Sequence, residues 1–366
     1  MAENNFNEFK NLDVFKTIYS DLIFDEQEKI VKVYDSESEE YDALINGAGL
    51  IDLSGCSLFE LKGKDSLDYL HRITTNALKD LKQGELSSTI FTNEKGRMID
   101  RATVVNNGDH LLVLGSAAFR PKLYSWINRY IISEDIKVTD LSFANSVFQV
   151  MGSQSRSFLS MIFGDVASKL QPGKMIKVQL EHTDYFLFLK NEFNRNCYFI
   201  ICRQENSDFL LNYMFEHKSV FDFRAVGSAA YDIFRINNGI PSAPNEINDS
   251  YTPNEANLLE DVSFTKGCYI GQEVIARLDT YGKAQRKLAM VTFDTYTEDL
   301  ERSVVYDNEE RESGVITTAS SSLNKSSAIA LAYIKKDLCV EGTELIAKAS
   351  NKKVFKITIC SFGQRK

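Results

Sequence analysis

The hydrophobic pattern of the chain changes near residue 286, and this change constrains the fold more than any other feature. Beyond that point helical periodicity stops, and short apolar segments alternate with polar turns. This pattern is typical of short antiparallel strands, and we expect them at 288–293, 314–319, 328–333, 344–348 and 354–360. We therefore predict a small antiparallel barrel or sandwich as a separate C-terminal domain, residues 286–366.

Before residue 286, apolar segments with helical periodicity alternate with segments typical of strands. The order of helix, strands and helix recurs about every 90 residues, which predicts two α+β units within residues 1–285. Pro241, Pro244 and Pro253 mark a loop-rich segment after the second unit. The expected helices lie at 117–133, 155–164, 207–217 and 224–237, and the expected strands at 58–61, 86–92, 98–105, 110–114, 147–151, 175–180, 185–189 and 197–202.

Composition excludes several classes of protein. The 51 acidic residues outnumber the 42 basic ones, and the net charge of −9 argues against a uniformly basic surface that binds nucleic acid. No apolar run approaches the roughly 20 residues that span a bilayer, and no signal-peptide pattern is present, so we expect a cytoplasmic protein without a membrane segment. The six cysteines and four histidines form no CxxC or CxxH pair, so their spacing predicts no metal site.

Residues 265–290 carry the pattern most indicative of chemistry. Lys266 precedes Cys268 by two positions, and a nearby ammonium favours the thiolate form of a cysteine. Gly271 is placed to begin a helix, with Glu273 in its first turn, where the helix dipole favours a carboxylate. Cys268 would then lie on a glycine-flanked loop whose free amides can bind a polar or anionic ligand. A half-buried cysteine in a tight loop fits the same residues, and both interpretations stay open here.

The segment Lys-Gly-Cys-Tyr-Ile-Gly-Gln-Glu at 266–273 matches the K-G-C-[FY]-x-G-Q-E signature of the YgfZ family, whose members bind folate and are linked to iron–sulfur proteins. The AGLIDLS segment at 48–54 resembles one that this family shares with its relative, the glycine-cleavage T-protein, an aminomethyltransferase. The resemblance covers roughly residues 38 to 360. Its further elements lie at Arg277, Tyr281, Gly282, Arg286, 235–241, 253–255, 314–318 and 329–333.

This resemblance implies a fold and a site. The fold would be a ring of three subdomains around a central channel that holds a folate, in agreement with two α+β units followed by a β domain. By alignment Asp100 falls at the catalytic aspartate of the T-protein, where a carboxylate would orient or deprotonate a folate amine, and Cys268 would be the functional thiol. The implied folate-binding residues are Lys266, Tyr269, Gln272, Glu273, Arg277, Arg235, Asn76 and Tyr231.

Simpler interpretations stand beside three of these assignments. Asp100 also suits a solvent-facing aspartate at a strand edge. Arg235 lies in a helix that ends at Gly239, where it would cap the helix or form an ion pair. Asn76 is equally typical of a turn.

The chain departs from the T-protein at positions that contact folate there. Phe199 stands where the T-protein has a glutamate that reads the pterin ring, and Tyr231 stands where it has an arginine. A carboxylate matches a pterin edge with two hydrogen bonds, which phenylalanine cannot replace. The T-protein also lacks a cysteine at the position of Cys268. These differences argue against aminomethyl transfer.

We therefore expect a YgfZ-like accessory protein that binds tetrahydrofolate or a one-carbon derivative. It would support iron–sulfur cluster assembly or repair and thereby tRNA modification, with iron–sulfur enzymes or their assembly factors as partners. The alternative is an aminomethyltransferase that uses tetrahydrofolate. One cysteine cannot hold a cluster alone, so no resident cluster is expected. The basic residues between 277 and 287 suit a polyglutamylated folate tail as well as RNA, and we do not expect direct tRNA contact.

Overall fold

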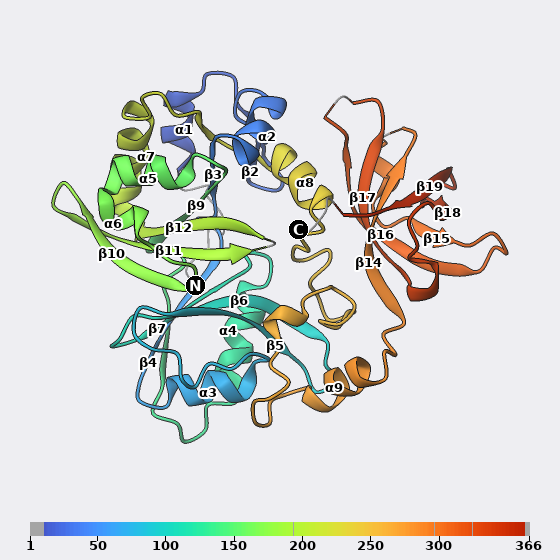
Figure 1. Cartoon of the computed structure of the whole chain (residues 1–366), viewed down its shortest axis with the longest axis horizontal. Helices are drawn as coiled ribbons and strands as arrows, with labels where there is room; N and C mark the ends of the chain where they lie inside the picture. The colour runs from blue at the N-terminus through green and yellow to red at the C-terminus, as the bar shows by residue number, and fades with distance from the viewer. Residues whose placement is uncertain (1–10, 193, 296, 324, 363–366) are drawn as a thin grey trace, which may run out of the picture.

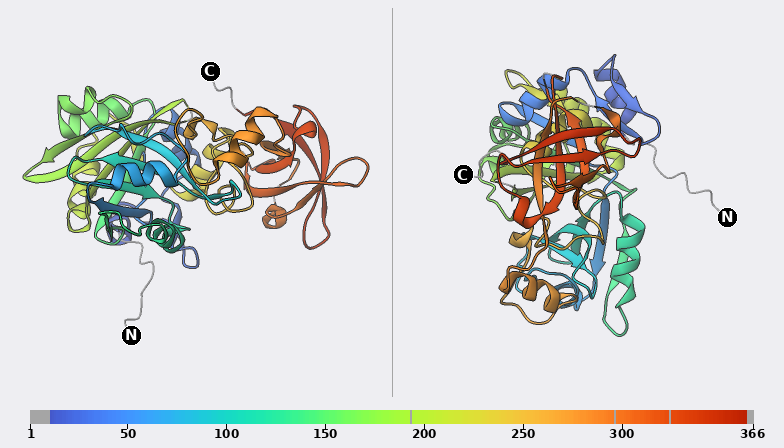
Figure 2. Two further views of the ribbon diagram at one scale, coloured as in Figure 1. Left: turned by 90° about the horizontal axis from the view of Figure 1, so that it is seen from below. Right: turned by 90° about the vertical axis from the view of Figure 1, so that its right-hand side faces the viewer.

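The structure, a computed structural model, describes residues 11–192, 194–295, 297–323 and 325–362. Two large β-sheets, the two-stranded sheet β1-β2 and their helices form a body, and a closed barrel lies beside it (Figure 1). The body and the barrel follow one another along the long axis of the molecule (Figure 2).

A five-stranded antiparallel sheet, in the order β5-β6-β7-β4-β8, forms one half of the body. Helices α3 and α4 pack on its outer face, where Tyr69, Leu70 and Leu123 are fully buried. Pro121 lies at the start of α4, where its missing N–H removes no helical hydrogen bond. The elements are β4 (Ser57–Lys62), α3 (Ser66–Ile73), β5 (Leu86–Thr92), β6 (Met98–Asn106), β7 (Leu111–Gly115), α4 (Arg120–Arg129) and β8 (Lys137–Asp140).

A six-stranded sheet, in the order β10-β11-β12-β9-β3-β13, forms the other half. Helices α1, α5 and α7 cover its outer face around Phe15, Phe158 and Leu211. The elements are α1 (Leu12–Ile18), β1 (Ile23–Asp25), β2 (Ile30–Val33), α2 (Glu37–Ile45), β3 (Ala48–Asp52), β9 (Asn145–Met151), α5 (Ser155–Phe163), α6 (Asp165–Ser168), β10 (Lys174–Leu180), β11 (Thr183–Glu192), β12 (Arg195–Arg203), α7 (Ser207–Glu216), β13 (Phe223–Ala225) and α8 (Ser228–Asn237).

The inner faces of the two sheets pack against each other. Val105 and Leu112 of the first sheet share a core with Phe188 and Phe199 of the second, whose rings stack at 4.7 Å. Phe234 of α8 joins this core, and α8 also contacts barrel strands β16 and β17. Helix α8 therefore lies where the body meets the barrel (Figure 1).

The C-terminal strands close into a six-stranded antiparallel barrel, in the order β14-β17-β16-β15-β18-β19. The ring of Tyr333 stacks on that of Tyr251 at 3.5 Å, and its hydroxyl donates to the carbonyl of Glu246 at 2.7 Å. These contacts attach the barrel to the loop that follows α8. The strands are β14 (Arg286–Phe293), β15 (Val304–Tyr306), β16 (Glu312–Ser321), β17 (Ala328–Lys335), β18 (Glu344–Lys348) and β19 (Val354–Cys360).

The structure confirms the expected fold class, an α+β body followed by an antiparallel barrel. All five expected barrel strands are present, and only the three-residue β15 was not foreseen. For the body, the sheet position of β3 was not foreseen, and one expected helix boundary was wrong. Strand β3 precedes the first sheet in sequence but belongs to the second, where it pairs with β9. The helix expected at 224–237 begins only at Ser228, because Phe223 and Ala225 are buried in β13, parallel to β3.

Candidate functional site

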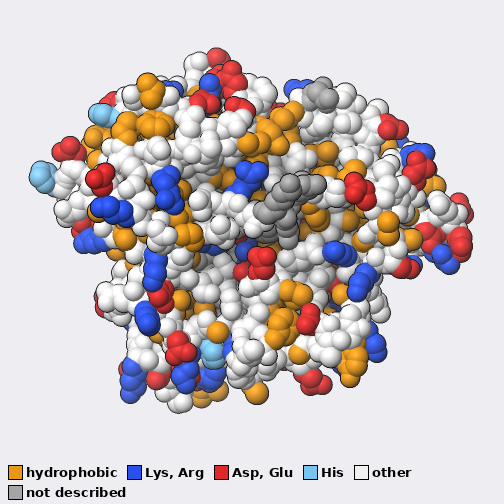
Figure 3. Space-filling view, viewed as in Figure 1, with side chains coloured by type: hydrophobic (Ala, Val, Ile, Leu, Met, Phe, Trp, Pro, Cys, Tyr) orange, Lys and Arg blue, Asp and Glu red, His pale blue; other side chains and the backbone are white. Residues whose placement is uncertain are grey.

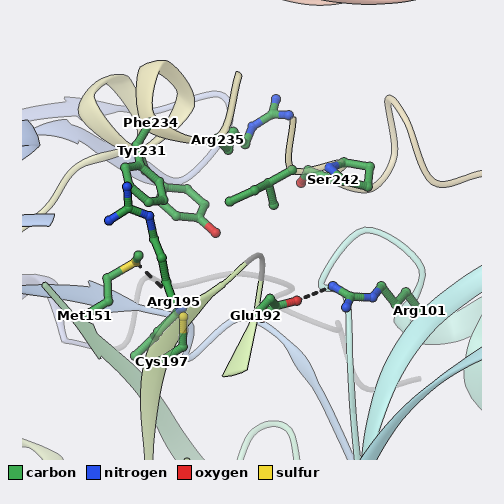
Figure 4. A pocket seen from close by; sticks show the side chains of 12 residues that line it. Arg101, Met151, Glu192, Arg195, Cys197, Tyr231, Phe234, Arg235 and Ser242 are labelled. Atoms are coloured by element: carbon green, nitrogen blue, oxygen red, sulfur yellow. Dashed lines mark hydrogen bonds and ion pairs between the residues drawn. The ribbon is translucent and has the colours of Figure 1, made fainter. Parts of the chain in front are cut away.

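A cavity of about 120 Å³ lies where the two sheets and α8 meet. An apolar cavity of about 150 Å³ is enough to bind benzene, so this one is slightly smaller than a site for one aromatic ring. Its wall combines aromatic, aliphatic and charged side chains from distant parts of the chain (Figure 4). The lining residues are Arg101, Gln149, Met151, Glu192, Arg195, Cys197, Tyr231, Phe234, Arg235, Ile240, Pro241 and Ser242.

A buried ion-pair network forms one side of the cavity. Arg101, on β6, pairs with Glu192 at the end of β11, and its Nε donates to Asp261 at 2.6 Å. Lys190 lies 3.4 Å from the second Glu192 oxygen and donates to Thr103 at 2.9 Å. Burial alone would raise the pKa of Glu192, but Lys190 and Arg101 outweigh it and hold that pKa at about 2. Glu192 is therefore a fixed negative charge.

Aromatic and sulfur groups form the opposite side. The Arg195 guanidinium lies over the ring of Phe234, 5.0 Å from its centroid, and Tyr231 projects from the same helix (Figure 4). Burial raises the pKa of the Tyr231 hydroxyl above its usual range. Burial also raises the pKa of Cys197 to about 12, with the nearby Glu192 charge acting in the same direction. Both groups therefore stay neutral near pH 7.

Arg235 lines the cavity but its guanidinium is already bound. It donates to Asp232 at 2.5 Å, to Glu246 at 2.9 Å and to the hydroxyl of Thr318 in the barrel at 2.9 Å. The Glu246 side chain is completely buried. Arg235 therefore forms an ion pair, as one of the two interpretations of the sequence expected. Its hydrogen bond to Thr318 joins α8 to the barrel beside the cavity.

The segment that contains Cys268 lies on the first sheet and leads into α9 (Gln272–Thr280). Gly271 begins this helix with φ 85°, and a Cβ there would come within 2.6 Å of the Asn93 carbonyl oxygen. Only glycine tolerates both constraints. Thr92 Oγ1 donates to the carbonyl of Ile270 at 2.6 Å. These contacts confirm the expected helix start and hold the segment on the turn between β5 and β6.

Lys266 is occupied within this segment. Its ammonium donates to the carbonyl oxygens of His71, Thr74 and Asn76, all within 2.7 Å, at the C-terminal end of α3. A cation is favoured at that end of a helix, although burial lowers the pKa of Lys266 to about 7. The ammonium that was expected to favour a Cys268 thiolate thus anchors the loop to the body.

Cys268 itself is exposed, so it is not a core thiol. It is not among the residues that line the central cavity. Tyr269 is buried in the core between the first sheet and the barrel, and Gln272 is half-buried. Glu273 and Arg277 are exposed on α9. The structure therefore brings Lys266, Tyr269, Gln272, Glu273 and Arg277 together around the cysteine loop, whereas only Arg235 and Tyr231 of the expected binding residues reach the cavity.

Asp100 lies in the interior, on the helix-covered face of the first sheet. Its carboxylate accepts hydrogen bonds from the backbone amides of Arg101 and Ser116, both at 2.9 Å, and it is fully buried. Burial raises its pKa to about 6. A solvent-facing strand edge is wrong, because β6 lies between β5 and β7. A position in the cavity is wrong as well, since its neighbour Arg101 takes the face that points there.

Asn76 has the structural role of a turn residue. Its amide nitrogen donates to the carbonyl of Ser88 at 2.8 Å, and its amide oxygen accepts from the backbone of Ala77 at 2.8 Å. Its backbone carbonyl is one of the acceptors of Lys266. Asn76 therefore stabilises the turn that binds the Lys266 ammonium of the cysteine loop.

The cavity residues that the sequence analysis missed include Arg101, Glu192, Arg195 and Cys197. They have no shared spacing, because they come from β6 and from both strands of the β11–β12 hairpin. Phe199 was expected at the cavity, but it packs on Phe188. Cys197, two positions earlier on the same face of β12, lies in the wall instead.

A second cavity, of about 420 Å³, lies elsewhere between the sheets and includes none of the residues implied by the sequence. Its charged rim residues pair with each other, Lys177 with Asp184 at 2.6 Å and Arg203 with Glu205 at 3.5 Å. Within the described ranges, no group of three or more His, Cys, Asp or Glu is arranged to hold a metal ion. In the same part of the chain, no helix has the length and apolarity that crossing a membrane requires.

The whole architecture matches that of a known class, the aminomethyltransferase-like fold. The crystal structure of glycine cleavage system aminomethyltransferase T from Bartonella henselae superposes with a TM-score of 0.84 and covers 99% of both chains. At 17% identity this similarity shows the fold alone.

The chain belongs to the GCVT N-terminal domain family, which matches residues 7–266. An aminomethyltransferase of Staphylococcus carnosus is 24% identical over 354 residues, covering 93% of this chain and 96% of that protein. A putative chloroplastic transferase of Arabidopsis thaliana is 25% identical over 313 residues, covering 85% of this chain and 70% of that protein.

Proposed function

We propose that this protein binds a reduced folate at the central cavity and serves as a YgfZ-like accessory factor for iron–sulfur proteins, with Cys268 as its working thiol. The observation that carries the proposal is an exposed cysteine on a loop tied to a cavity residue. Asp261 binds Arg101 through its carboxylate, and its carbonyl accepts from the Thr75 hydroxyl at 2.6 Å. Ser263, which starts the loop, donates to the Thr75 carbonyl at 3.0 Å.

The cavity has the chemistry that the ring of a folate requires. Its volume of about 120 Å³ is smaller than a folate, so only part of the pterin ring would enter and the glutamate tail would lie outside. Phe234 and Tyr231 offer aromatic surface, and Glu192 is an acceptor for ring N–H groups. Tetrahydrofolate is also the acceptor in the aminomethyltransferase reaction, which supports folate as the ligand of this family member.

Acid–base chemistry on a folate amine is less well supported. A general base works best with a pKa near the working pH. Glu192 is the one carboxylate in the cavity wall, and its pKa of about 2 makes it a weak base. Asp100, the expected catalytic carboxylate, is sealed beneath α4. These two facts favour an accessory role over group transfer.

The proposed partners are iron–sulfur enzymes or their assembly factors, reached through the Cys268 loop. Basic and acidic side chains are interspersed on the face of the molecule in Figure 3, without a continuous basic area. That distribution favours a protein partner over direct tRNA contact there. We place this activity in the cytoplasm.

The second candidate is aminomethyl transfer from a lipoylated carrier to tetrahydrofolate. The similarity to proteins named aminomethyltransferase, over 93% of the chain in one case, favours it. Incubation with an aminomethylated carrier protein and tetrahydrofolate separates the two functions. Release of ammonia and formation of methylenetetrahydrofolate at many turnovers would support the transferase and contradict the accessory role.

Two measurements test the main proposal. Calorimetric titration with tetrahydrofolate should show binding, and its absence at millimolar ligand would remove folate from the function. Cys268→Ala should fail to restore iron–sulfur enzyme activity in a strain that lacks this gene, whereas Cys360→Ala, a change of a half-buried barrel cysteine, should restore it. Full restoration by Cys268→Ala would show that the thiol is dispensable.

A further inference from the structure

The second cavity lies at the other end of the β11–β12 hairpin from the central one. Cys197 of β12 lines the central cavity, and Ile201 of the same strand lines the second. Phe199 lies between them on the same face of the strand and packs on Phe188, so core side chains separate the two cavities. The turn between β10 and β11, which lines the second cavity, lies at the end of the molecule opposite the barrel (Figure 1). A ligand in the second cavity would therefore not contact the proposed folate site.

The floor of the second cavity is apolar. Leu58 and Leu112 come from the first sheet and Ile201 from the second, and all three are buried. Leu141 and Phe186 are only half-buried, which leaves apolar surface that a ligand would remove from water. At about 420 Å³ the cavity is nearly three times the roughly 150 Å³ that holds benzene. It therefore has room for a body of two fused rings.

The mouth of the second cavity is polar. Phe186 and Ile201, which pair across β11 and β12, mark the edge of the apolar floor. Asp184 precedes Phe186 by two residues, and side chains two apart in a strand share a face. By the same spacing Arg203 follows Ile201. The basic side chains in the wall outnumber the acidic ones: Lys177, Arg203, His110 and His182 against Asp184 and Glu205. An apolar floor with a more basic mouth suits a ligand that has an apolar body and an anionic head.

The acidic side chains of the mouth leave Arg203 weakly paired. Asp184 is bound inside the sheet, by Lys177 at 2.6 Å and by Gln179 at 2.9 Å, each at a different carboxylate oxygen. Arg203 contacts Glu205 through one nitrogen at 3.5 Å, and both side chains are exposed. Such a pair contributes little, whereas a guanidinium binds a carboxylate best through two parallel hydrogen bonds. A ligand carboxylate that offers both oxygens to Arg203 would therefore compete well with Glu205.

We infer that the second cavity binds an amphipathic carboxylate, with an apolar body of about two fused rings on the floor between the sheets and the carboxylate on Arg203 at the mouth. A cationic head in the same position would meet Lys177 and Arg203, which repel it. A neutral hydroxyl would lose the charge of the pair with Arg203. The site is independent of the proposed folate site, so the protein would take two different small molecules.

The test uses three ligands that share one body and differ in the head group: 2-naphthoate, 2-naphthalenemethanol and 2-naphthylmethylamine. In calorimetric titrations of the full chain, the naphthoate should bind about fivefold more tightly than the alcohol, the upper range for an exposed ion pair, and the amine should bind most weakly. Tetrahydrofolate should not displace the naphthoate. No naphthoate binding at millimolar concentration, tightest binding of the amine, or displacement by tetrahydrofolate would each overturn the inference.

Two pairs of variants locate the head group. Arg203→Met should remove the preference for the naphthoate over the alcohol, and Glu205→Gln, which frees the guanidinium, should tighten naphthoate binding by about twofold or more. The matched controls are Lys174→Met and Glu85→Gln, which break an exposed ion pair of 2.8 Å outside the cavity wall. Both controls should bind the three ligands as the wild type does. Equal effects in the two pairs would show that net charge, and not this site, selects the ligand.

A third variant tests the apolar floor. Leu141→Trp, at a half-buried position, should fill part of the cavity and weaken all three ligands by about tenfold or more, since it removes the space for the shared body. Unchanged binding would place the ligands elsewhere and refute the inference. Should Leu141→Trp melt early, the smaller change Leu141→Phe must weaken the same three ligands to a lesser degree.

Discussion

The central cavity and the Cys268 loop are built in opposite ways. The cavity gathers side chains from segments more than 130 residues apart, among them Arg101 and Arg235, each of which is bound to acidic partners. The loop is one continuous segment with an exposed thiol, fixed by Gly271 and by the Lys266 ammonium. A continuous motif is visible in a sequence, whereas a dispersed cavity is not. The contrast also indicates that stability is concentrated at the cavity and reactivity at the loop.

The largest effect is expected at the cavity, from Arg235→Met. This change leaves the fully buried Glu246 without its cation, and removing one partner of a buried pair costs about 3–5 kcal/mol. Urea unfolding should measure that loss, with Arg203→Met as the exposed control. A loss no larger than that of the control would show that the ion pair does not stabilise this wall.

A smaller effect is expected from Lys266→Met at the base of the loop. Three backbone carbonyls lose their common donor, which should cost about 1–3 kcal/mol. Hydrogen exchange should increase at residues 263–271 and little elsewhere. Lys95→Met, at an exposed lysine nearby, should stay within about 0.5 kcal/mol of the wild type. Unchanged exchange in the loop would contradict the anchoring role.

Asp100→Asn tests the interior carboxylate through pH. Because its folded pKa is about 6, above the usual value of 3.8, Asp100 contributes most stability at low pH and loses it as pH rises through 6. Between pH 5 and pH 8 the wild type should therefore lose about 1–2 kcal/mol relative to the asparagine variant. Unfolding free energies at both pH values measure this difference. A constant difference would show that Asp100 ionises normally.

The smallest effect on stability is expected from Cys268→Ala. Its side chain is exposed, so unfolding free energy should change by no more than about 0.5 kcal/mol. Native protein should have one thiol that reacts rapidly with a maleimide, and Cys268→Ala should lose that reaction while Cys360→Ala keeps it. Rapid labelling in the Cys268→Ala variant would place the reactive thiol elsewhere.

The sequence predicted what local patterns determine. Alternation predicted the barrel strands, and Gly271 predicted the start of α9, because both depend on neighbouring residues. It could not predict which face of β6 is the ligand side. Adjacent strand residues point to opposite faces, and both faces of β6 are buried, so Asp100 and Arg101 look equally suitable until the second sheet is in place. The same holds for Cys197 and Phe199.

The position of β3 has a consequence for how the molecule divides. Because Asp52 pairs with Phe148 across β3 and β9, the segment that forms the five-stranded sheet leaves and re-enters the six-stranded sheet at neighbouring strands. This segment is therefore an insertion between β3 and β9, and its two ends are adjacent in space. A short linker could join β3 to β9 without interrupting the six-stranded sheet. Excising it would remove Arg101 from the cavity wall, whereas the other lining residues belong to the rest of the chain.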